Sequence, residues 1–386
     1  MAGIYIHIPF CKQACHYCNF HFATSLHYKN DLIAALLKEI ELVNFFDHTP
    51  SSTSFSQGEE AVPEKIATIY VGGGTPSLLN IEEIRSLLHK IRNKFSVTDD
   101  AEITLEANPD DITEKKLLEW KDAGINRLSI GVQSFFSEDL QWMNRAHTAS
   151  QALSSLQLSL KYFDNLTIDL IYGTPQLTNE KWKQNVETAI SLNIPHLSCY
   201  ALTVEPKTPL DKMIQQNISE DVNPDKQSEQ FMLLMQWLED AGYEHYEISN
   251  FAKPGWRSRH NSSYWQGKNY IGLGPSAHSF NGTERRWNIS NNTIYIASLN
   301  KGIIPYEKEE LTATQKINEY IMTSLRTIEG INLKVINCEP QDTSNVLLNK
   351  SKKFIDTGLM KFEKKSLTLT KEGKLLADGI AADLFF

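Results

Sequence analysis

Short β-type runs alternate with longer amphipathic stretches through the first two-thirds of the chain, and this alternation restricts the possible folds more than any other feature. The runs cover residues 4–8, 66–71, 102–106, 127–132, 166–171 and 196–202. The amphipathic stretches between them cover residues 31–43, 81–95, 114–123, 150–163 and 180–192. Such alternation predicts an α/β fold of right-handed βαβ units around a parallel sheet. A full or partial barrel and a Rossmann fold both satisfy the pattern.

Two segments interrupt the alternation. Residues 47–65 are rich in Ser, Thr, Pro and acidic side chains, and we predict a long surface loop there. Beyond about Trp256 the alternation stops, and the Gly-, Ser-, Asn- and aromatic-rich residues 257–281 are expected to form a functional loop rather than a core element. The remaining chain predicts two helices, two β-type runs and a final helix, at residues 314–327, 346–357, 359–362, 366–369 and from Lys371.

Helices followed by a β-hairpin are typical of a winged-helix module, so we expect three units. They are a barrel at 1–250, connecting loops at 251–310 and a winged-helix-like domain at 311–386. The last unit carries eleven Lys and Arg against nine Asp and Glu, and the formal net charge of the chain is −9. Because nucleic-acid binding needs a dominant basic surface, we expect no nucleic-acid partner. A role as a lid or in partner docking fits this unit better.

The chain contains no apolar run near the roughly 18 residues that a membrane-spanning helix needs. The short apolar stretch at 4–10 is interrupted by His7 and Pro9, unlike a secretory signal. We therefore expect a cytoplasmic protein, with peripheral membrane contact only through an acceptor. Its five cysteines are too few for a disulfide framework. Cys199 and Cys338 stand alone and are expected to be small buried residues.

The other three cysteines form a C-x3-C-x2-C array in residues 10–20 (FCKQACHYCNF). Cys11, Cys15 and Cys18 are close enough in sequence to converge on one metal centre. A structural zinc ion would need a fourth ligand, which His16 or His21 could supply. A 4Fe–4S cluster on three cysteines instead leaves one iron free to bind a substrate or cofactor. The array also follows the first β-type run, where ligands gather at the carboxyl ends of parallel strands.

The cysteine spacing resembles that of the radical S-adenosylmethionine (SAM) superfamily. The segment VGGGTP at 71–76 is similar to the glycine motif of that family, and its glycines allow a close backbone approach to a ligand. No G-x-G-x-x-G stands at a strand-to-helix junction, which argues against the Rossmann alternative. The resemblance implies a partial (β/α)6 barrel of TIM type, in which the open iron chelates SAM. An electron from the cluster then cleaves SAM to a 5′-deoxyadenosyl radical.

The opening YIHIPFC at 5–11 closely resembles the branch that contains the oxygen-independent coproporphyrinogen III oxidases. Carrying the SAM contacts of that branch onto this chain gives Tyr5, Tyr17, Gly73, Gly74, Thr75, Glu106, Gln133, Arg145, Asp169 and Ala201. The residue types suit the ligand, because carboxylates accept from ribose hydroxyls and an arginine can pair with the methionine carboxylate. An amide such as that of Gln133 both donates and accepts.

Two departures separate the chain from the oxidases. The oxidases carry a further cysteine where this chain has Phe20, and they have a longer segment before the array, which here begins at residue 11. Both features are similar to the HemW branch of haem chaperones, which carries an H-N-x-x-Y-W motif associated with haem. Residues 260–265 (HNSSYW) match it, so the resemblance implies His260 as a haem contact. His278, in a second polar segment, is the other candidate.

We therefore expect a HemW-type haem chaperone that binds a 4Fe–4S cluster, SAM and haem, and transfers haem to an acceptor protein. An electron donor is a further expected partner. The alternative is an enzyme, an oxygen-independent coproporphyrinogen III oxidase that decarboxylates two propionates. A third hypothesis treats the cluster as a structural or redox-sensing element with no porphyrin ligand. The residues leave open whether SAM is cleaved productively.

Overall fold

The structure, a computed structural model, describes residues 1–44, 64–336 and 342–386. Most of the predicted loop at 47–65 lies outside these residues, and so does Cys338. Cys199 is buried, as predicted. Among the described residues, no helix is both long enough and apolar enough to cross a membrane.

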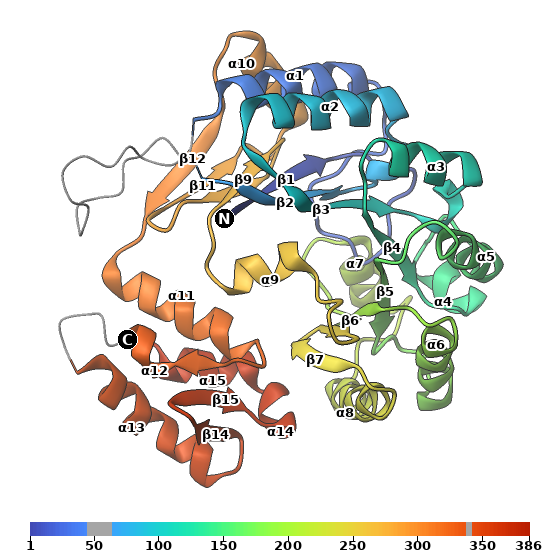
Figure 1. The fold of residues 1–386 in the computed structure, drawn as a ribbon. Coiled ribbons are helices and arrows are strands. Elements are labelled where there is room, and N and C mark those ends of the chain that lie inside the picture. The colour runs from blue at the N-terminus through green and yellow to red at the C-terminus, as the bar shows by residue number, and fades with distance from the viewer. Residues whose placement is uncertain (45–63, 337–341) are drawn as a thin grey trace, which may run out of the picture.

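A twelve-stranded sheet forms the body of the molecule (Figure 1). Its order is β12-β11-β10-β9-β1-β2-β3-β4-β5-β6-β8-β7. The strands β1 to β6 are parallel, and each falls on one of the six predicted β-type runs. They span Ala2–Ile8, Ile66–Gly73, Val97–Ala107, Arg127–Gln133, Leu166–Tyr172 and His196–Ala201. The predicted α/β class, a partial (β/α)6 barrel, is confirmed.

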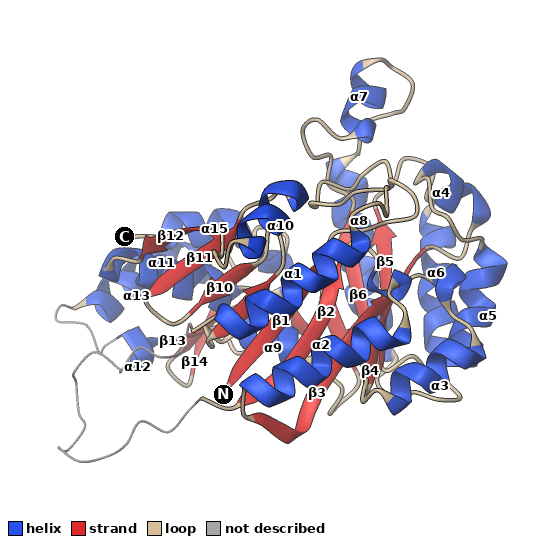
Figure 2. Ribbon diagram, turned by 90° about the horizontal axis from the view of Figure 1, so that it is seen from above, coloured by secondary structure: helices blue, strands red, loops and turns tan. Residues whose placement is uncertain are grey.

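Helices cover the outer face of these strands (Figures 1 and 2). They are α1 (Lys29–Leu42), α2 (Ile81–Lys94), α3 (Glu114–Asp122), α5 (Ala149–Ser159), α6 (Asn179–Ser191) and α8 (Pro224–Asp240). Local sequence fixes where they begin: Asn80 and Glu83 form a capping box on α2, and Thr148 and Gln151 form one on α5. Two shorter helices, α4 (Ser137–Trp142) and α7 (Pro209–Gln215), follow the carboxyl ends of β4 and β6. Figure 2 shows α7 projecting beyond the strand ends.

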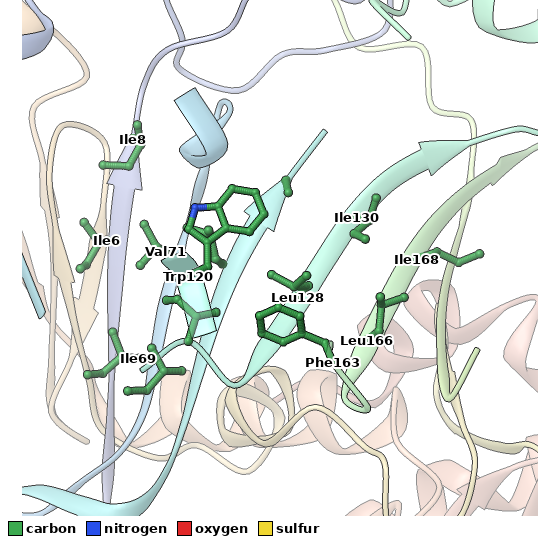
Figure 3. Close-up of a cluster of buried hydrophobic side chains, with 14 of the residues drawn as sticks. Ile6, Ile8, Ile69, Val71, Trp120, Leu128, Ile130, Phe163, Leu166 and Ile168 are labelled. Carbon is green, nitrogen blue, oxygen red and sulfur yellow. The ribbon is translucent and has the colours of Figure 1, made fainter. Parts of the chain in front are cut away.

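The two faces of the parallel strands differ in chemistry. Alternate residues such as Ile4, Ile6 and Ile8 pack under the helices, together with Trp120 and Phe163, in one continuous apolar core (Figure 3). The intervening residues, such as Tyr5 and His7, face the other way. Parallel strands covered on both faces usually read as continuous apolar runs. A polar inner face therefore indicates a chamber for a ligand rather than a second apolar core.

The expectation of loops between residues 257 and 281 was wrong. This region and its continuation to residue 310 contain regular elements: α9 (Arg259–Trp265), β9 (Tyr270–Leu273), β10 (His278–Phe280), β11 (Glu284–Asn288), α10 (Asn292–Asn300) and β12 (Tyr306–Glu310). The short strand β9 pairs in parallel with β1, nearly 270 residues earlier in the chain. Its Gly272 lies so close to the next strand that a Cβ atom would stand 2.0 Å from the carbonyl oxygen of His278. Glycine here marks close strand packing and not a flexible loop.

The strand β12 forms one edge of the sheet, and its four charged residues, at 307–310, are largely exposed. At the other edge lie β7 (Glu244–Glu247) and β8 (Asn250–Ala252). The C-terminal residues build a separate three-stranded antiparallel sheet with its own apolar core. Its elements are α11 (Ala313–Leu325), β13 (Ile331–Asn332), α12 (Leu333–Ile336), α13 (Thr343–Asp356), β14 (Met360–Glu363), β15 (Ser366–Leu369), α14 (Lys371–Lys374) and α15 (Ala377–Leu384). The predicted arrangement of helices and a hairpin is confirmed.

Candidate functional site

A cavity of about 550 Å³ opens at the carboxyl ends of β1 to β6. Its volume falls within the range of sites that enclose one drug-sized ligand. Each of the six strands contributes at least one residue to its wall. Every residue that the sequence associates with the cluster or with SAM lines it: Tyr5, Cys11, Cys15, Tyr17, Cys18, Gly73, Gly74, Thr75, Glu106, Gln133, Arg145, Asp169 and Ala201.

The three cysteines of the array lie at one side of this cavity and are half-buried. Burial raises the pKa of Cys11 to about 11 and also raises the pKa of Cys18, while the charge of Arg145 opposes both shifts. A thiol binds iron as the thiolate, so metal loading must release these protons. Among the described residues, no three His, Cys, Asp or Glu side chains are gathered closely enough to hold a single metal ion. The three thiols line the same cavity, and thiolates are the protein ligands of iron–sulfur clusters.

The loop that carries the cysteines is held by the residues that end α4. The side-chain amide of Asn144 donates to the carbonyl oxygen of Ala14 (2.7 Å) and accepts from the amide of Gln13 (2.6 Å). The ring of His16 hydrogen bonds through Nδ1 to the carbonyl oxygen of Trp142 at 2.8 Å. His21, the other possible zinc ligand, bonds through Nε2 to Asn292 Oδ1 at 2.8 Å. Each imidazole thus has one ring nitrogen engaged with a group other than the thiols.

A charged contact fastens the same loop to the end of β3. The ammonium group of Lys12 lies 2.7 Å from Asp110 Oδ2 and also contacts Asp111. Asp111 is buried and accepts a hydrogen bond from the hydroxyl of Ser77 at 2.7 Å. The cysteine loop is therefore tied to two neighbouring strand ends by side chains, independently of any cluster.

Arg145 connects the thiols to the floor of the cavity. Its Nη1 lies 3.4 Å from Cys15 Sγ, and its Nη2 donates to Asn108 Oδ1 and to the carbonyl oxygen of Gly131, both at 2.8 Å. Its Nε is buried and has no hydrogen-bond partner among the described residues. A buried donor without a partner is costly. The guanidinium is therefore suited to an anionic group in the cavity.

Two half-buried carboxyl groups face the cavity from β3 and β5. Glu106 accepts from the hydroxyl of Tyr70 at 2.8 Å and from the backbone N–H of Gly73 at 3.0 Å. Burial, reinforced by the nearby Asp169, raises the pKa of Glu106 to about 7. Burial likewise raises the pKa of Asp169 to about 7, although Arg145 and Arg127 oppose the shift. Both groups can accept hydrogen bonds from ligand hydroxyls.

Gln133 reaches the cavity through an unusual backbone conformation. Its φ is +67°, in the left-handed region that a residue other than glycine rarely adopts, and the pairing of β4 with β5 shifts register at this point. Such conformations cluster at ligand sites, where surrounding structure compensates for the strain. The bulge points the amide of Gln133 into the cavity instead of along the strand.

Comparison with known proteins agrees with this geometry. Residues 5–189 match the radical SAM superfamily, and residues 311–376 match the HemN C-terminal domain. The heme chaperone HemW of Bacillus subtilis is 32% identical over 384 residues, 98% of each chain, and that of Escherichia coli K12 is 34% identical over 85% of this chain and 83% of its own. This chain belongs to the HemW family. Membership in this radical SAM family implies a 4Fe–4S cluster and SAM.

A solved structure shares the fold of this HemW-family chain. The coproporphyrinogen III oxidase HemN from Escherichia coli superposes with a TM-score of 0.81 at 23% identity, covering 100% of this chain and 90% of the oxidase. At that identity the likeness concerns the fold alone. The expected resemblance to the radical SAM superfamily and its HemW branch is confirmed.

The HemW-type motif residue His260 does not line the cavity. Its side chain is buried, on a helix that packs against the inner face of β1 and β2. Its Nδ1 hydrogen bonds to Thr68 Oγ1 at 2.8 Å and its Nε2 to the hydroxyl of Tyr264 at 2.9 Å. Both ring nitrogens are therefore engaged, and the predicted haem contact at this residue has no nitrogen available for iron in this conformation.

The second candidate, His278, lies in a different environment. It is exposed on β10, with its ring centroid 6.2 Å from that of Trp287 on β11 and an interplanar angle of 30°. No hydrogen bond joins its ring nitrogens to any described residue. Desolvation, followed by the charge of Arg285, lowers the pKa of His278, which favours the neutral imidazole.

The predictions missed several residues at the cavity. Asn108, Ser129 and Tyr200 line it, and Tyr70 holds the carboxylate of Glu106. A signal for Tyr70 was present, because in β2 it shares with Thr68 and Gly72 the alternate positions that face inward. Asn108 directly follows the LEA segment that ends β3, at the strand end that borders the cavity.

Proposed function

We propose that this HemW-family protein binds a 4Fe–4S cluster through Cys11, Cys15 and Cys18, holds SAM beside it, and carries haem to an acceptor protein. The single observation that supports this most is that thirteen residues from six strands and the loops beyond their carboxyl ends line one cavity. When bound, the cluster supplies an open iron and an electron to SAM. A protein of this kind would also need an electron donor.

The polar groups of the cavity suit the parts of SAM. The unpartnered Nε of Arg145 would bind the methionine carboxylate, since guanidinium pairs well with carboxylate. Glu106 and Asp169 would accept hydrogen bonds from the ribose hydroxyls. The backbone at Gly73, Gly74 and Thr75 would approach the ligand closely, and Tyr5, Tyr17, Gln133 and Ala201 would complete the pocket.

The haem part of the proposal rests on the relatives named heme chaperone HemW and on the surface beside the cavity. Where the oxidases carry another cysteine, Phe20 is 69% exposed at the cavity rim. Among the proposed haem contacts, His278 offers a neutral, exposed imidazole beside Trp287, which His260 does not. An imidazole and a neighbouring aromatic ring are suited to haem iron and the porphyrin face. We therefore assign the haem contact to His278.

The C-terminal residues 311–386 are proposed to dock the acceptor or to cover the cargo, and residues 1–250 to form the unit that binds SAM. Several large apolar side chains are exposed on the C-terminal elements: Met322, Ile328, Val335, Val346, Phe362, Leu375, Leu376 and Phe386. These side chains are the first candidates for apolar contacts with an acceptor.

The test uses protein reconstituted anaerobically with iron and sulfide. Iron analysis, SAM titration by calorimetry and haem titration by absorbance are combined with an activity assay on coproporphyrinogen III. The chaperone proposal predicts cluster loading, SAM binding and tight haem binding without turnover. Turnover of coproporphyrinogen III would favour the oxidase instead. Cluster loading with neither haem binding nor turnover would favour the structural or redox-sensing role.

A further inference from the structure

The helix α9, which contains the HNSSYW motif, is anchored on the inner face of the sheet. Figure 1 shows it on the opposite side of β1 and β2 from α1 and α2. The carboxylate of Glu102 on β3 accepts from the backbone N–H groups of Arg259 and His260, each at 3.0 Å. Glu102 is four residues before Glu106 on the same strand, so both project from the same face. One strand thus holds the start of α9 and the carboxylate of the cavity.

His260 is fixed on this face as a neutral ring. Thr68 and Tyr264 engage its two nitrogens, and burial followed by the charge of Arg127 lowers the pKa of His260 to about 3. Gly3 makes the space for it, because a Cβ atom there would lie 3.2 Å from the imidazole ring and 2.7 Å from Thr68 Oγ1. The ring therefore has one orientation and cannot leave it without breaking two hydrogen bonds.

Tyr70 links His260 to the cavity. The rings of Tyr70 and His260 are stacked, with centroids 5.1 Å apart and an interplanar angle of 26°. The hydroxyl of Tyr70 donates to Glu106 Oε1 at 2.8 Å. Glycine at position 72 allows this contact between Tyr70 and Glu106. A Cβ atom there would lie 2.7 Å from the Tyr70 ring and 2.9 Å from Glu106 Oε1. The contacts run without interruption from α9 through Tyr70 to Glu106.

We propose that His260 is a positioning residue for SAM: it orients Tyr70, and Tyr70 orients the carboxylate of Glu106 toward the ligand. This inference rests on the proposed binding of SAM at Glu106. It assigns the HNSSYW segment of this chain to the floor of the SAM site and not to the cargo.

The experiment measures SAM affinity by calorimetry on the reconstituted protein for His260→Ala, His260→Phe, Tyr70→Phe and the double variant Tyr70→Phe/His260→Ala. A lost hydrogen bond to a charged group weakens binding roughly tenfold or more. We expect Tyr70→Phe to weaken SAM binding by about that factor. His260→Ala should have a similar effect, and His260→Phe, which retains the ring stack, a smaller one. The double variant should be no weaker than the worse single variant, because residues acting through one contact are not additive. His89→Ala, an exposed histidine on α2, is the matched control.

Haem titration of the same variants separates positioning from ligation. We expect His260→Phe and His260→Ala to bind haem as the wild type does. Loss of haem binding with intact SAM affinity would overturn the inference, and so would additive effects of Tyr70→Phe and His260→Ala. A wild type that binds no SAM would refute the proposed function itself, whereas normal SAM affinity in all variants would refute only the role of His260. If His260→Ala fails to fold, the SAM affinities of His260→Phe and Tyr70→Phe are compared with that of the wild type instead.

Discussion

Glu106 and Asp169 are the two residues at which the chemistry of the cavity depends most on pH. Each carboxyl group has its pKa raised to about 7, chiefly by burial. The folded pKa exceeds the unfolded value near 4, so the folded protein holds these protons more tightly. The contribution of each group to stability is therefore present at acidic pH and is lost as the pH rises through about 7.

SAM binding should show the opposite dependence. A carboxylate accepts two ribose hydrogen bonds, whereas the protonated acid must use one oxygen as a donor. We expect SAM affinity to rise by roughly tenfold between pH 6 and pH 8, since about 1.4 kcal/mol corresponds to one pKa unit. Glu106→Gln should weaken binding and make this profile less steep, while Asp169 still titrates. Calorimetric titration across the pH range is the measurement, and a wild-type profile that is already flat would contradict the assignment.

The assignment of haem to His278 predicts a selective loss. His278→Ala removes the proposed iron ligand while leaving α9 and the cavity untouched, so the Soret band of bound haem should shift and haem affinity should fall at least tenfold. SAM affinity should be unchanged. The exposed His89→Ala variant is again the control. Equal haem affinity of His278→Ala and His89→Ala would show that haem does not bind at His278.

Single residues of the cavity could be predicted from sequence because each lies in a recognisable local motif. Cys11 and Arg145 are examples, since their neighbours in the chain identify them. The environment of His260 could not be predicted in this way. Its partner Thr68 is 192 residues away in sequence, and only the folded sheet brings the two side chains together. A motif thus identified the residue but not its surroundings.

At the level of elements, the cysteine loop is shaped by the end of α4. Asn144 adopts a φ of +57° and its side chain bonds to both Gln13 and Ala14. Glycine tolerates this backbone conformation, so Asn144→Gly removes the side-chain bonds with little added strain. The sequence offered no sign of this clamp, because the two segments are about 130 residues apart.

We expect Asn144→Gly to load less iron on reconstitution and to lose its cluster faster in air. Two hydrogen bonds of about 1 kcal/mol each are removed from the loop. Asn144→Asp, which retains the acceptor for Gln13, should be affected less. Iron content and the decay of cluster absorbance are the measurements. Identical loading in all three proteins would show that the loop is ordered without this contact.

The short elements between residues 257 and 310 illustrate why strand prediction failed there. The strands β9 and β10 have four and three residues, too few to show a period. Their stability comes from pairing with β1 and with each other, which is a property of the whole sheet. The longer parallel strands were predicted because helices separate them and repeat the pattern.

At the scale of the whole molecule, the C-terminal module contacts the barrel through a half-buried charge. Lys374 on α14 donates to His245 Nδ1 on β7 at 2.8 Å. Burial lowers the pKa of Lys374 to about 8 and that of His245 to about 3. The folded pKa of Lys374 lies below its unfolded value near 10.4, so its burial is unfavourable below pH 8 and becomes less so as the pH rises toward 10.

Replacing Lys374 with Met should therefore stabilise the protein at pH 7, by about 1–2 kcal/mol, and this advantage should shrink between pH 8 and pH 10. Urea unfolding of both proteins at several pH values measures it. The exposed Lys352→Met is the control and should show no such trend. A destabilised Lys374→Met at pH 7 would mean that the bond to His245 outweighs the cost of burying the charge.

The edge strand β12 has a consequence for how this protein meets others. A free sheet edge is a ready template on which another chain can add a strand, and charged side chains discourage such pairing. Four of the five residues of β12 are charged. A partner is therefore not expected to extend this sheet with a strand of its own. At high protein concentration, edge-to-edge association of copies through β12 is not expected either. Recognition of a recipient protein must then depend on side-chain surfaces. Point substitutions in those surfaces are therefore expected to block haem delivery, whereas a peptide that mimics an added strand is not.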